Sequence, residues 1–311
     1  MTSPASQAHR TAPIDPKLSM GEVALTVRNL GVAVRFYTLA LGLTLFTHQD
    51  GQAVLGTPDG HPLVTLYGDP QAPTPPANAT GLYHLAVAFP TRPDLARWLK
   101  HAAALGLQLG QNNHKTHEAF YFSDPEGNGI ELYHDWPREQ WPFKDGRFAS
   151  FDGVAIDIQD LLGTLAGNDA GWTDAPVATR MGHVHLKMSD TDATRTFYRD
   201  VMGFDITADG MGAVFAAAGG YHHHLGNNAW HSRGGPKAPD GALGLRHYTL
   251  ELSSGAELDA VTARLKDAGV AVLATPAGQF TRDPAGNRML LRAGPSTIES
   301  ALAALSDTAT A

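Results

Sequence analysis

Residue types that bind divalent metal ions stand near the starts of four predicted strands: Glu22, His84, His183 and His247. Residues two apart in a strand share a face, so each of these strands can direct one such side chain into a common concavity. Inward-facing imidazoles and carboxylates carry a large desolvation cost unless something pairs with them. A divalent cation would supply that pairing, so the pattern predicts a metal site inside a curled sheet.

The sequence is internally duplicated. Two stretches repeat at a constant spacing of 161 residues, each with a glycine at a strand start, a Phe-Tyr pair and a glycine that ends a helix (Gly21, Phe36-Tyr37, Gly42; Gly182, Phe197-Tyr198, Gly203). Two further pairs repeat at spacings of 163 and 159 residues (Gly81 to His84 with Gly244 to His247; Asp124 to Asn128 with Asp283 to Asn287). A fixed period indicates a duplicated structural unit, so we expect four similar modules in two similar halves.

Each module is expected to contain one strand, one helix and three more strands, which is a βαβββ unit. In the first module, Asn29 can cap a helix that Gly42 would end in the left-handed conformation. In the second, Thr91 and Pro93 open a helix that ends at Gly106. The predicted fold class is α+β, with the four modules paired into two curled mixed-sheet half-barrel domains.

This repeat divides the chain into five segments. We expect a disordered leader, an N-terminal domain of two modules, a connector, a C-terminal domain of two modules and a tail that forms a helix (residues 1–17, 18–136, 137–180, 181–295 and 296–311).

Composition excludes several classes of function. The formal net charge is −8 and no Lys/Arg run is present, which argues against a nucleic-acid partner. The absence of cysteine excludes disulfides, thiolate metal sites and cysteine nucleophiles. No apolar run approaches the roughly 20 residues of a membrane helix, and the leader lacks an apolar secretory core. We expect a cytoplasmic protein with no membrane partner, and edge strands make a homodimer plausible.

A residue on the last strand of a module would complete a metal-binding cup. Glu131 fills that place in the second module, and one of the consecutive histidines 222–224 fills it in the third. In a strand, His222 and His224 would face one way and His223 the other, so at most two of them can point inward together.

These features resemble the vicinal oxygen chelate superfamily, which includes glyoxalases, bleomycin-resistance proteins and extradiol dioxygenases. The resemblance rests on the paired modules, the histidines at strand starts and the Asp-Pro-x-Gly-Asn turn before Glu131, over about residues 18–136 and 181–292. Three stretches are similar to the extradiol ring-cleaving, catechol 2,3-dioxygenase-like branch: Tyr83 to Leu85, His114 to Tyr121, and Asp124 to Tyr133.

In the N-terminal half, the resemblance implies that His84 and Glu131 are metal ligands. His114 matches a histidine that contacts substrate in extradiol enzymes, and with Tyr121 it forms the candidate catalytic pair. Glu22 stands where the family has a second ligating histidine. The chain would then offer one histidine and two carboxylates, whereas two histidines and one carboxylate are typical of non-haem Fe(II) sites.

The C-terminal half departs from the family pattern in another way. His183 and His247 occupy the strand-start positions, but Leu290 stands in the place of Glu131 and cannot bind a metal. His224, or alternatively His222, could replace the missing acid and give a three-histidine cup that resembles zinc sites with one open position. Both halves therefore remain candidate sites.

Each of these residues also has a structural interpretation. Any of the strand-start histidines could be an ordinary hydrogen-bonded side chain, and Glu22 or Glu131 could face solvent. The histidine run could be a solvated edge, and His114 could be a surface loop residue.

The function implied by the resemblance is a metal-dependent extradiol dioxygenase that cleaves a catechol-like aromatic diol with O₂. Its expected cofactor is Fe(II), with Mn, Zn or Ni as alternatives. A glyoxalase-type isomerase or lyase of the same fold is the second hypothesis. The third is a binding or resistance protein that holds a small molecule without metal.

Overall fold

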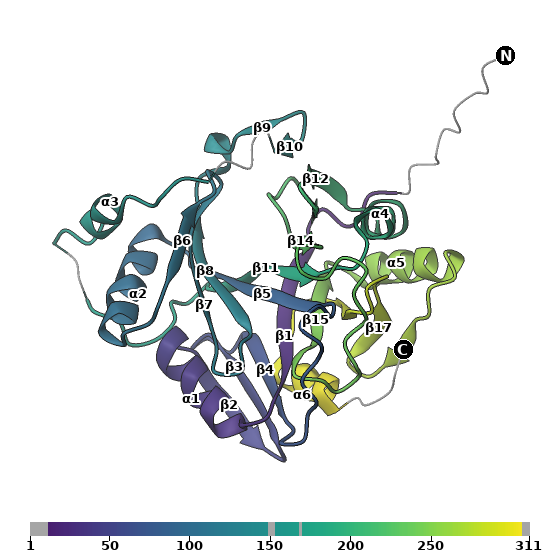
Figure 1. Ribbon diagram of the computed structural model, residues 1–311, viewed down its shortest axis with the longest axis horizontal. Helices are drawn as coiled ribbons and strands as arrows, with labels where there is room; N and C mark the ends of the chain where they lie inside the picture. Colours follow the sequence, from purple (N-terminus) through teal and green to yellow (C-terminus); the bar gives the residue numbers. More distant parts are fainter. Residues whose placement is uncertain (1–11, 149–152, 168–169, 307–311) are drawn as a thin grey trace.

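The structure is a computed structural model and describes residues 12–148, 153–167 and 170–306. It contains two mixed eight-stranded sheets. Sheet A has the strand order β16-β17-β18-β15-β1-β4-β3-β2, and sheet B has the order β12-β13-β14-β11-β5-β8-β7-β6. Figure 1 shows β5 and β11 side by side across the middle of the molecule, with α1 and α2 on one side and α4 and α5 on the other.

Sheet A is built from the first and fourth modules. The first contains β1 (Ser19–Val27), α1 (Leu30–Leu41), β2 (Thr44–Gln49), β3 (Gln52–Gly56) and β4 (Pro62–Gly68). The fourth contains β15 (Gly244–Leu252), α5 (Gly255–Asp267), β16 (Leu273–Thr275), β17 (Gly278–Arg282) and β18 (Arg288–Ala293).

Sheet B is built from the second and third modules. The second contains β5 (Gly81–Ala88), α2 (Arg92–Ala104), β6 (Gly110–Asn113), β7 (His117–Ser123) and β8 (Gly129–Asp135). The third contains β11 (Arg180–Lys187), α4 (Thr191–Thr196) with a π-helical continuation (Phe197–Met202), β12 (Asp205–Gly210), β13 (Ala213–Ala217) and β14 (Leu225–Asn228).

The four βαβββ modules and the α+β class agree with expectation, but the modules do not pair in chain order. The first strands join the modules through antiparallel pairs, β1 with β15 and β5 with β11. Each sheet therefore takes one module from either side of the connector, instead of two consecutive modules. Because the four first strands carry similar patterns, the sequence does not say which of them are neighbours.

The central strands separate an apolar face from a polar one. On β5, Leu85 and Val87 belong to the main hydrophobic core, whereas His84 and Ala86 face the opposite way. The apolar faces of both sheets meet in this single core, which also receives Tyr37 of α1 and Trp98 of α2. The polar face of sheet B is thus left to line a cavity, whereas α6 packs on sheet A.

Local signals in the sequence explain how the helices and turns are fixed. The Asn29 side chain accepts a hydrogen bond from the Val32 amide, and Gly42 ends α1 with a φ of 70°. In the Asp-Pro-x-Gly-Asn turn, Asp124 accepts hydrogen bonds from the backbone and side chain of Asn128. Tyr37 of the first module donates to the same carboxylate, which ties this turn to α1.

The remaining segments connect or cover the modules. The connector contains a 3-10 turn (Arg138–Gln140), the short strands β9 (Phe143–Lys144) and β10 (Arg147–Phe148), and α3 (Ile158–Gly163). The expected tail helix is α6 (Ile298–Ser306), which packs against β3 and β4. No helix in the described ranges is both long and apolar enough to cross a membrane.

Part of the expected disordered leader is ordered. Residues 1–11 lie outside the described part of the chain, but Ile14 is buried in the main core and its amide donates to the Gly203 carbonyl. Burial of Ile14 and the hydrogen bond that accompanies it account for this difference.

Candidate metal centre and substrate cavity

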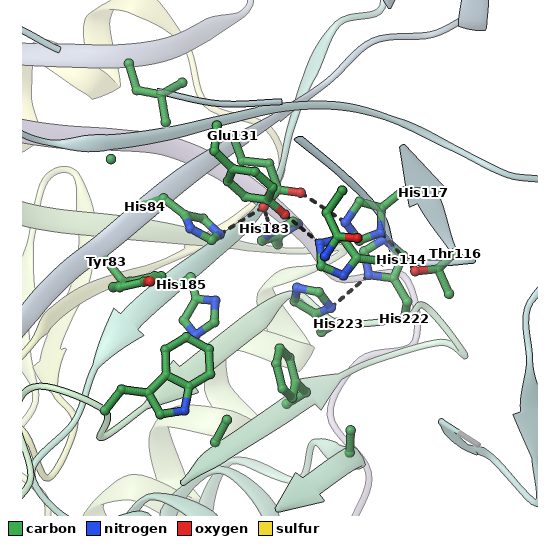
Figure 2. Close-up of a pocket in the computed structure, with 18 of the residues that line it drawn as sticks. Tyr83, His84, His114, Thr116, His117, Glu131, His183, His185, His222 and His223 are labelled. Carbon is green, nitrogen blue, oxygen red and sulfur yellow. Dashed lines mark hydrogen bonds and ion pairs between the residues drawn. The ribbon is translucent and has the colours of Figure 1, made fainter. Parts of the chain in front are cut away.

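Three ligand-type side chains meet on the polar face of sheet B. Glu131 of β8 lies beside Ala86 of β5, and Ala86 lies beside His183 of β11. The small Ala86 side chain leaves room above it, and His84 stands two residues earlier on the same face. Glu131 Oε2 is 3.0 Å from His84 Nε2 and 3.2 Å from His183 Nε2. Figure 2 shows these three side chains converging from their separate strands.

The chemistry of these residues fits a divalent cation. All three are buried, and one buried carboxylate oxygen faces two imidazole nitrogens. Among the described residues, the buried His183 Nδ1 has no hydrogen-bond partner, and His84 Nε2 faces the Glu131 carboxylate at 3.0 Å. Two histidines and one carboxylate with open positions are the donor set typical of non-haem Fe(II).

The electrostatics of the group favour metal binding. Burial acts to raise the pKa of the Glu131 carboxyl, yet His183, His117 and His84 hold that pKa well below its usual range. Burial is the main cause that lowers the pKa of His183. An ionised carboxylate and a neutral imidazole are the forms that bind metal.

A second histidine layer surrounds this group. His117 Nε2 is 3.0 Å from the other Glu131 oxygen, Oε1, and His117 Nδ1 is hydrogen-bonded to Thr116 Oγ1 at 2.9 Å. Asn228 Nδ2 donates to His185 Nε2 at 3.0 Å. Such bonds fix the orientation of imidazole rings around a metal ion.

The group lies on the wall of a cavity of about 610 Å³. Aromatic side chains form much of the remaining wall, including Tyr83, Phe215 and Trp230. His114 Nε2 and the Tyr121 hydroxyl are 2.7 Å apart in the same cavity. Burial, followed by the charge of His117, lowers the pKa of His114 to about 3, and burial followed by Glu131 raises that of Tyr121 well above its usual range.

Comparison with known proteins agrees with this architecture. The model of the family described as Glyoxalase/Bleomycin resistance protein/Dioxygenase superfamily matches residues 19–132 and 180–291. The chain belongs to this superfamily.

Relatives within the superfamily include named dioxygenases. The chain is 39% identical over 269 residues to a Bacillus subtilis (strain 168) protein named catechol-2,3-dioxygenase, covering 85% of this chain and 93% of the relative. It is 26% identical over 174 residues to biphenyl-2,3-diol 1,2-dioxygenase 3 of Rhodococcus globerulus, covering 54% of this chain and 90% of the relative.

Solved structures share the superfamily fold at low sequence identity. Glyoxalase I from Zea mays has a TM-score of 0.53 and 16% identity, with 88% of this chain and 92% of that chain covered. A Bacillus subtilis protein whose dioxygenase assignment is itself provisional has a TM-score of 0.66 and 13% identity, with 92% and 87% covered.

In this superfamily member, Glu22 and His247 do not join the group in sheet B. Both lie on the polar face of sheet A, where Leu290 lies beside Thr249 as Glu131 lies beside Ala86. Ser296 Oγ donates to Glu22, and Arg292 Nη1 is 3.8 Å from the same carboxylate. The geometry therefore does not support separate ligand sets in the N-terminal and C-terminal halves. Modules two and three share sheet B, so ligands from both halves meet in one group.

His224 is also absent from the group, contrary to its expected role. Its Nδ1 accepts a hydrogen bond from the Ala218 amide. Residues 218–224 precede β14 instead of forming its start, so strand alternation does not govern them. His222 and His223 consequently both line the cavity of this superfamily member.

Sequence reasoning missed His117 and Asp135 as potential ligands. Tyr121 pairs with Glu131 across β7 and β8, and His117 pairs with Asp135 in the same ladder. Residues two or four positions apart in a strand share a face. His117 lies four residues before Tyr121, and Asp135 lies four residues after Glu131. The inward direction expected for Tyr121 and Glu131 therefore indicates that His117 and Asp135 also point inward.

Proposed function

We propose that this protein is an extradiol-type ring-cleaving dioxygenase that acts on a catechol-like diol with O₂. The observation that carries the proposal is the His84–His183–Glu131 group at the wall of an aromatic-lined cavity. The names of the two dioxygenase relatives support it.

In this proposal, His84, His183 and Glu131 hold one divalent ion, for which Fe(II) is our first choice. When bound, that ion supplies adjacent positions for the two diol oxygens and for O₂. Mn, Zn and Ni remain alternative ions for the same three ligands. The side chain of Ala86 is small, which leaves room for the three ligands to meet above it.

His114 is the proposed proton acceptor. Its lowered pKa leaves the imidazole neutral near pH 7, so its lone pair would be available for a proton from a diol hydroxyl that a bound ion had made more acidic. Tyr121 holds the His114 ring through the 2.7 Å hydrogen bond between its hydroxyl and Nε2. This contact fixes the orientation of the base within the cavity.

The cavity wall is suited to an aromatic ring. Tyr83 and Trp230 meet edge to face at 5.6 Å, and His185 lies 5.1 Å from Tyr83, measured between ring centroids. The volume lies within the usual range of roughly 300–1,000 Å³ for small-molecule sites. These rings can orient a planar substrate and exclude water from the metal ligands.

The carboxylates that line the cavity support the glyoxalase alternative less well than the dioxygenase proposal. That reaction uses a carboxylate to move a proton, a task that Glu131 would have to combine with binding the ion. Among the described residues that line the cavity, Glu131 is the only carboxylate. The metal-free alternative does not call for two imidazoles that converge on one buried Glu131 oxygen, as those of His84 and His183 do.

An oxygen-uptake assay tests the proposal. Protein reconstituted anaerobically with Fe(II) should consume one O₂ per catechol and form a coloured ring-opened product, while 1,3-dihydroxybenzene, which cannot chelate through adjacent oxygens, should give no uptake. His114→Ala should lower kcat by about 10²–10⁴-fold at unchanged iron content. The proposal fails if iron-loaded protein consumes no O₂ with any of a panel of substituted catechols.

A further inference from the structure

His185 of β11 is a buried histidine of the cavity wall that belongs to no ligand group among the described residues. It lies beside His84 in the ladder of β5 and β11, and two residues after His183 on the same face. Figure 2 shows its ring next to that of His84, and the two ring centroids are 4.9 Å apart. A hydrogen-bonding atom that His185 presents to the cavity therefore lies near the proposed metal ligands.

Asn228 of β14 determines which ring nitrogen of His185 carries the proton. The backbone N–H of Trp230 can only donate, and it donates to Asn228 Oδ1 at 3.2 Å. The Asn228 amide is therefore oriented with its NH₂ group toward His185, and Nδ2 is 3.0 Å from His185 Nε2. Because Nδ2 also can only donate, Nε2 accepts, and the proton of the neutral ring is on Nδ1.

Packing holds the His185 ring in this orientation. The ring lies against Gly226 of β14, where an added Cβ would be 2.8 Å from Nδ1 and 2.9 Å from Cγ. Tyr83 and Phe215 contact it with ring centroids 5.1 and 5.7 Å away. Nε2 is occupied by Asn228, so the Nδ1–H group is the donor that remains for a molecule in the cavity.

We propose that His185 is a substrate-binding residue that donates a hydrogen bond from Nδ1 to an oxygen of the diol bound beside His84. The inference rests on the proposed function, because it needs a diol next to the His84–His183–Glu131 group. It gives the two polar ends of the cavity different tasks, since neutral His114 offers a lone pair and His185 offers an N–H donor. A diol oxygen that carries negative charge gains a charge-assisted hydrogen bond from such a donor.

Nitrogen-15 NMR of Zn²⁺-loaded protein tests the position of the proton, because zinc has no redox chemistry. Long-range ¹H–¹⁵N spectra should show His185 protonated at Nδ1 and unprotonated at Nε2, with its signals assigned by their loss in His185→Leu. In Asn228→Asp the new carboxylate can only accept, so the proton should move to Nε2. A wild-type ring that is protonated at Nε2 overturns the inference.

Calorimetric titration of the same Zn²⁺-loaded protein with catechol tests the hydrogen bond itself. His185→Leu has no donor and should bind catechol about 10-fold or more weakly than the wild type at equal zinc content. His185→Gln is the matched variant that keeps an N–H donor, and it should bind more tightly than His185→Leu. Losses of the same size in both variants overturn the inference, because they assign the effect to ring packing instead of the donor.

The outcomes separate this inference from the proposed function. Equal catechol affinity in the wild type and His185→Leu, with ring cleavage retained by the Fe(II)-loaded enzyme, overturns the hydrogen bond and leaves the dioxygenase proposal standing. Wild-type protein that holds zinc but binds no catechol overturns both. Because the wild-type ring alone reports the position of the proton, that result stands even if Asn228→Asp misfolds.

Discussion

At the residue scale, equivalent positions in the two sheets have different neighbours. His84 and His247 occupy matching places, but His84 lies 3.0 Å from Glu131, whereas Leu290 takes the place of that carboxylate in sheet A. Among the described residues, neither nitrogen of His247 has a hydrogen-bond partner. A buried polar group without a partner costs about 1–3 kcal/mol. We therefore expect His247 to lower stability, and it belongs to no ligand group among the described residues.

The titration of His247 follows from its burial. Burial, followed by the charges of Arg288, Arg246 and Arg292, lowers its pKa well below the usual value. As the pH falls through about 6.5, the unfolded chain takes up a proton at this position and the folded chain does not. Because the folded-state pKa is lower than the unfolded one, stability is present at higher pH and is lost on acidification.

Replacing His247 by leucine should remove both effects. At pH 7.5 we expect His247→Leu to have a free energy of unfolding at least equal to that of the wild type, because an apolar side chain of similar size needs no hydrogen bond. Between pH 7.5 and 5.5, the variant should lose about 1.4 kcal/mol less stability than the wild type. Urea unfolding of metal-free protein at both pH values measures this difference. An unchanged pH dependence, with His48→Leu as the exposed control, would contradict the account.

At the element scale, the polar faces of the two sheets are covered differently. Sheet A is covered by α6, whose Ala304 packs with Phe280 and Leu290. Sheet B keeps a cavity of about 610 Å³ at the matching place. The tail helix therefore explains why ligand-type residues of sheet A are closed off, while those of sheet B face a space that can hold a substrate.

A charge introduced into α6 should separate stability from metal binding. Ala304 is fully buried, so Ala304→Glu should lower the free energy of unfolding by about 3 kcal/mol or more through desolvation and overpacking. Metal content per folded chain should not change, because α6 has no part in sheet B. Chemical denaturation and elemental analysis measure the two quantities. Ser306→Glu, on an exposed position of the same helix, is the matched control; equal losses in both variants would argue against the packing of α6 over sheet A.

Local elements were predictable from the sequence because their signals are local. Asn29 and Gly42 act as the predicted cap and stop of α1, and the two Asp-Pro-x-Gly-Asn turns form alike. The sequence predicts a strand at the histidine segment 222–224, and this prediction is wrong, since Gly219 and Gly220 adopt positive φ and turn the chain before β14. Its inward-facing members therefore could not be chosen by alternation.

At the scale of the whole molecule, the site depends on how the modules pair. His84 and Glu131 precede the connector and His183 follows it, yet all three lie in sheet B. The sequence identified each of these residues as a candidate ligand but divided them between two sites. Long-range pairing of repeated strands carries no local signal, because β1, β5, β11 and β15 have similar apolar and polar faces.

The pairing also accounts for the apparent loss of a ligand in each half. Glu22 seemed to replace a histidine in the first half, and Leu290 seemed to replace an acid in the second. When the modules are combined as sheet B combines them, His183 supplies the histidine and Glu131 supplies the acid. Sheet B then holds one complete group of two histidines and one carboxylate, and sheet A holds an incomplete set.

Anomalous diffraction from crystals soaked in Zn²⁺ tests this central claim most directly, because it locates the ion without relying on catalysis. We predict a peak in sheet B with His84 Nε2, His183 Nε2 and a Glu131 oxygen each about 2.0–2.2 Å away. A peak between Glu22 and His247 in sheet A, or no peak near His84 and His183, would contradict the account.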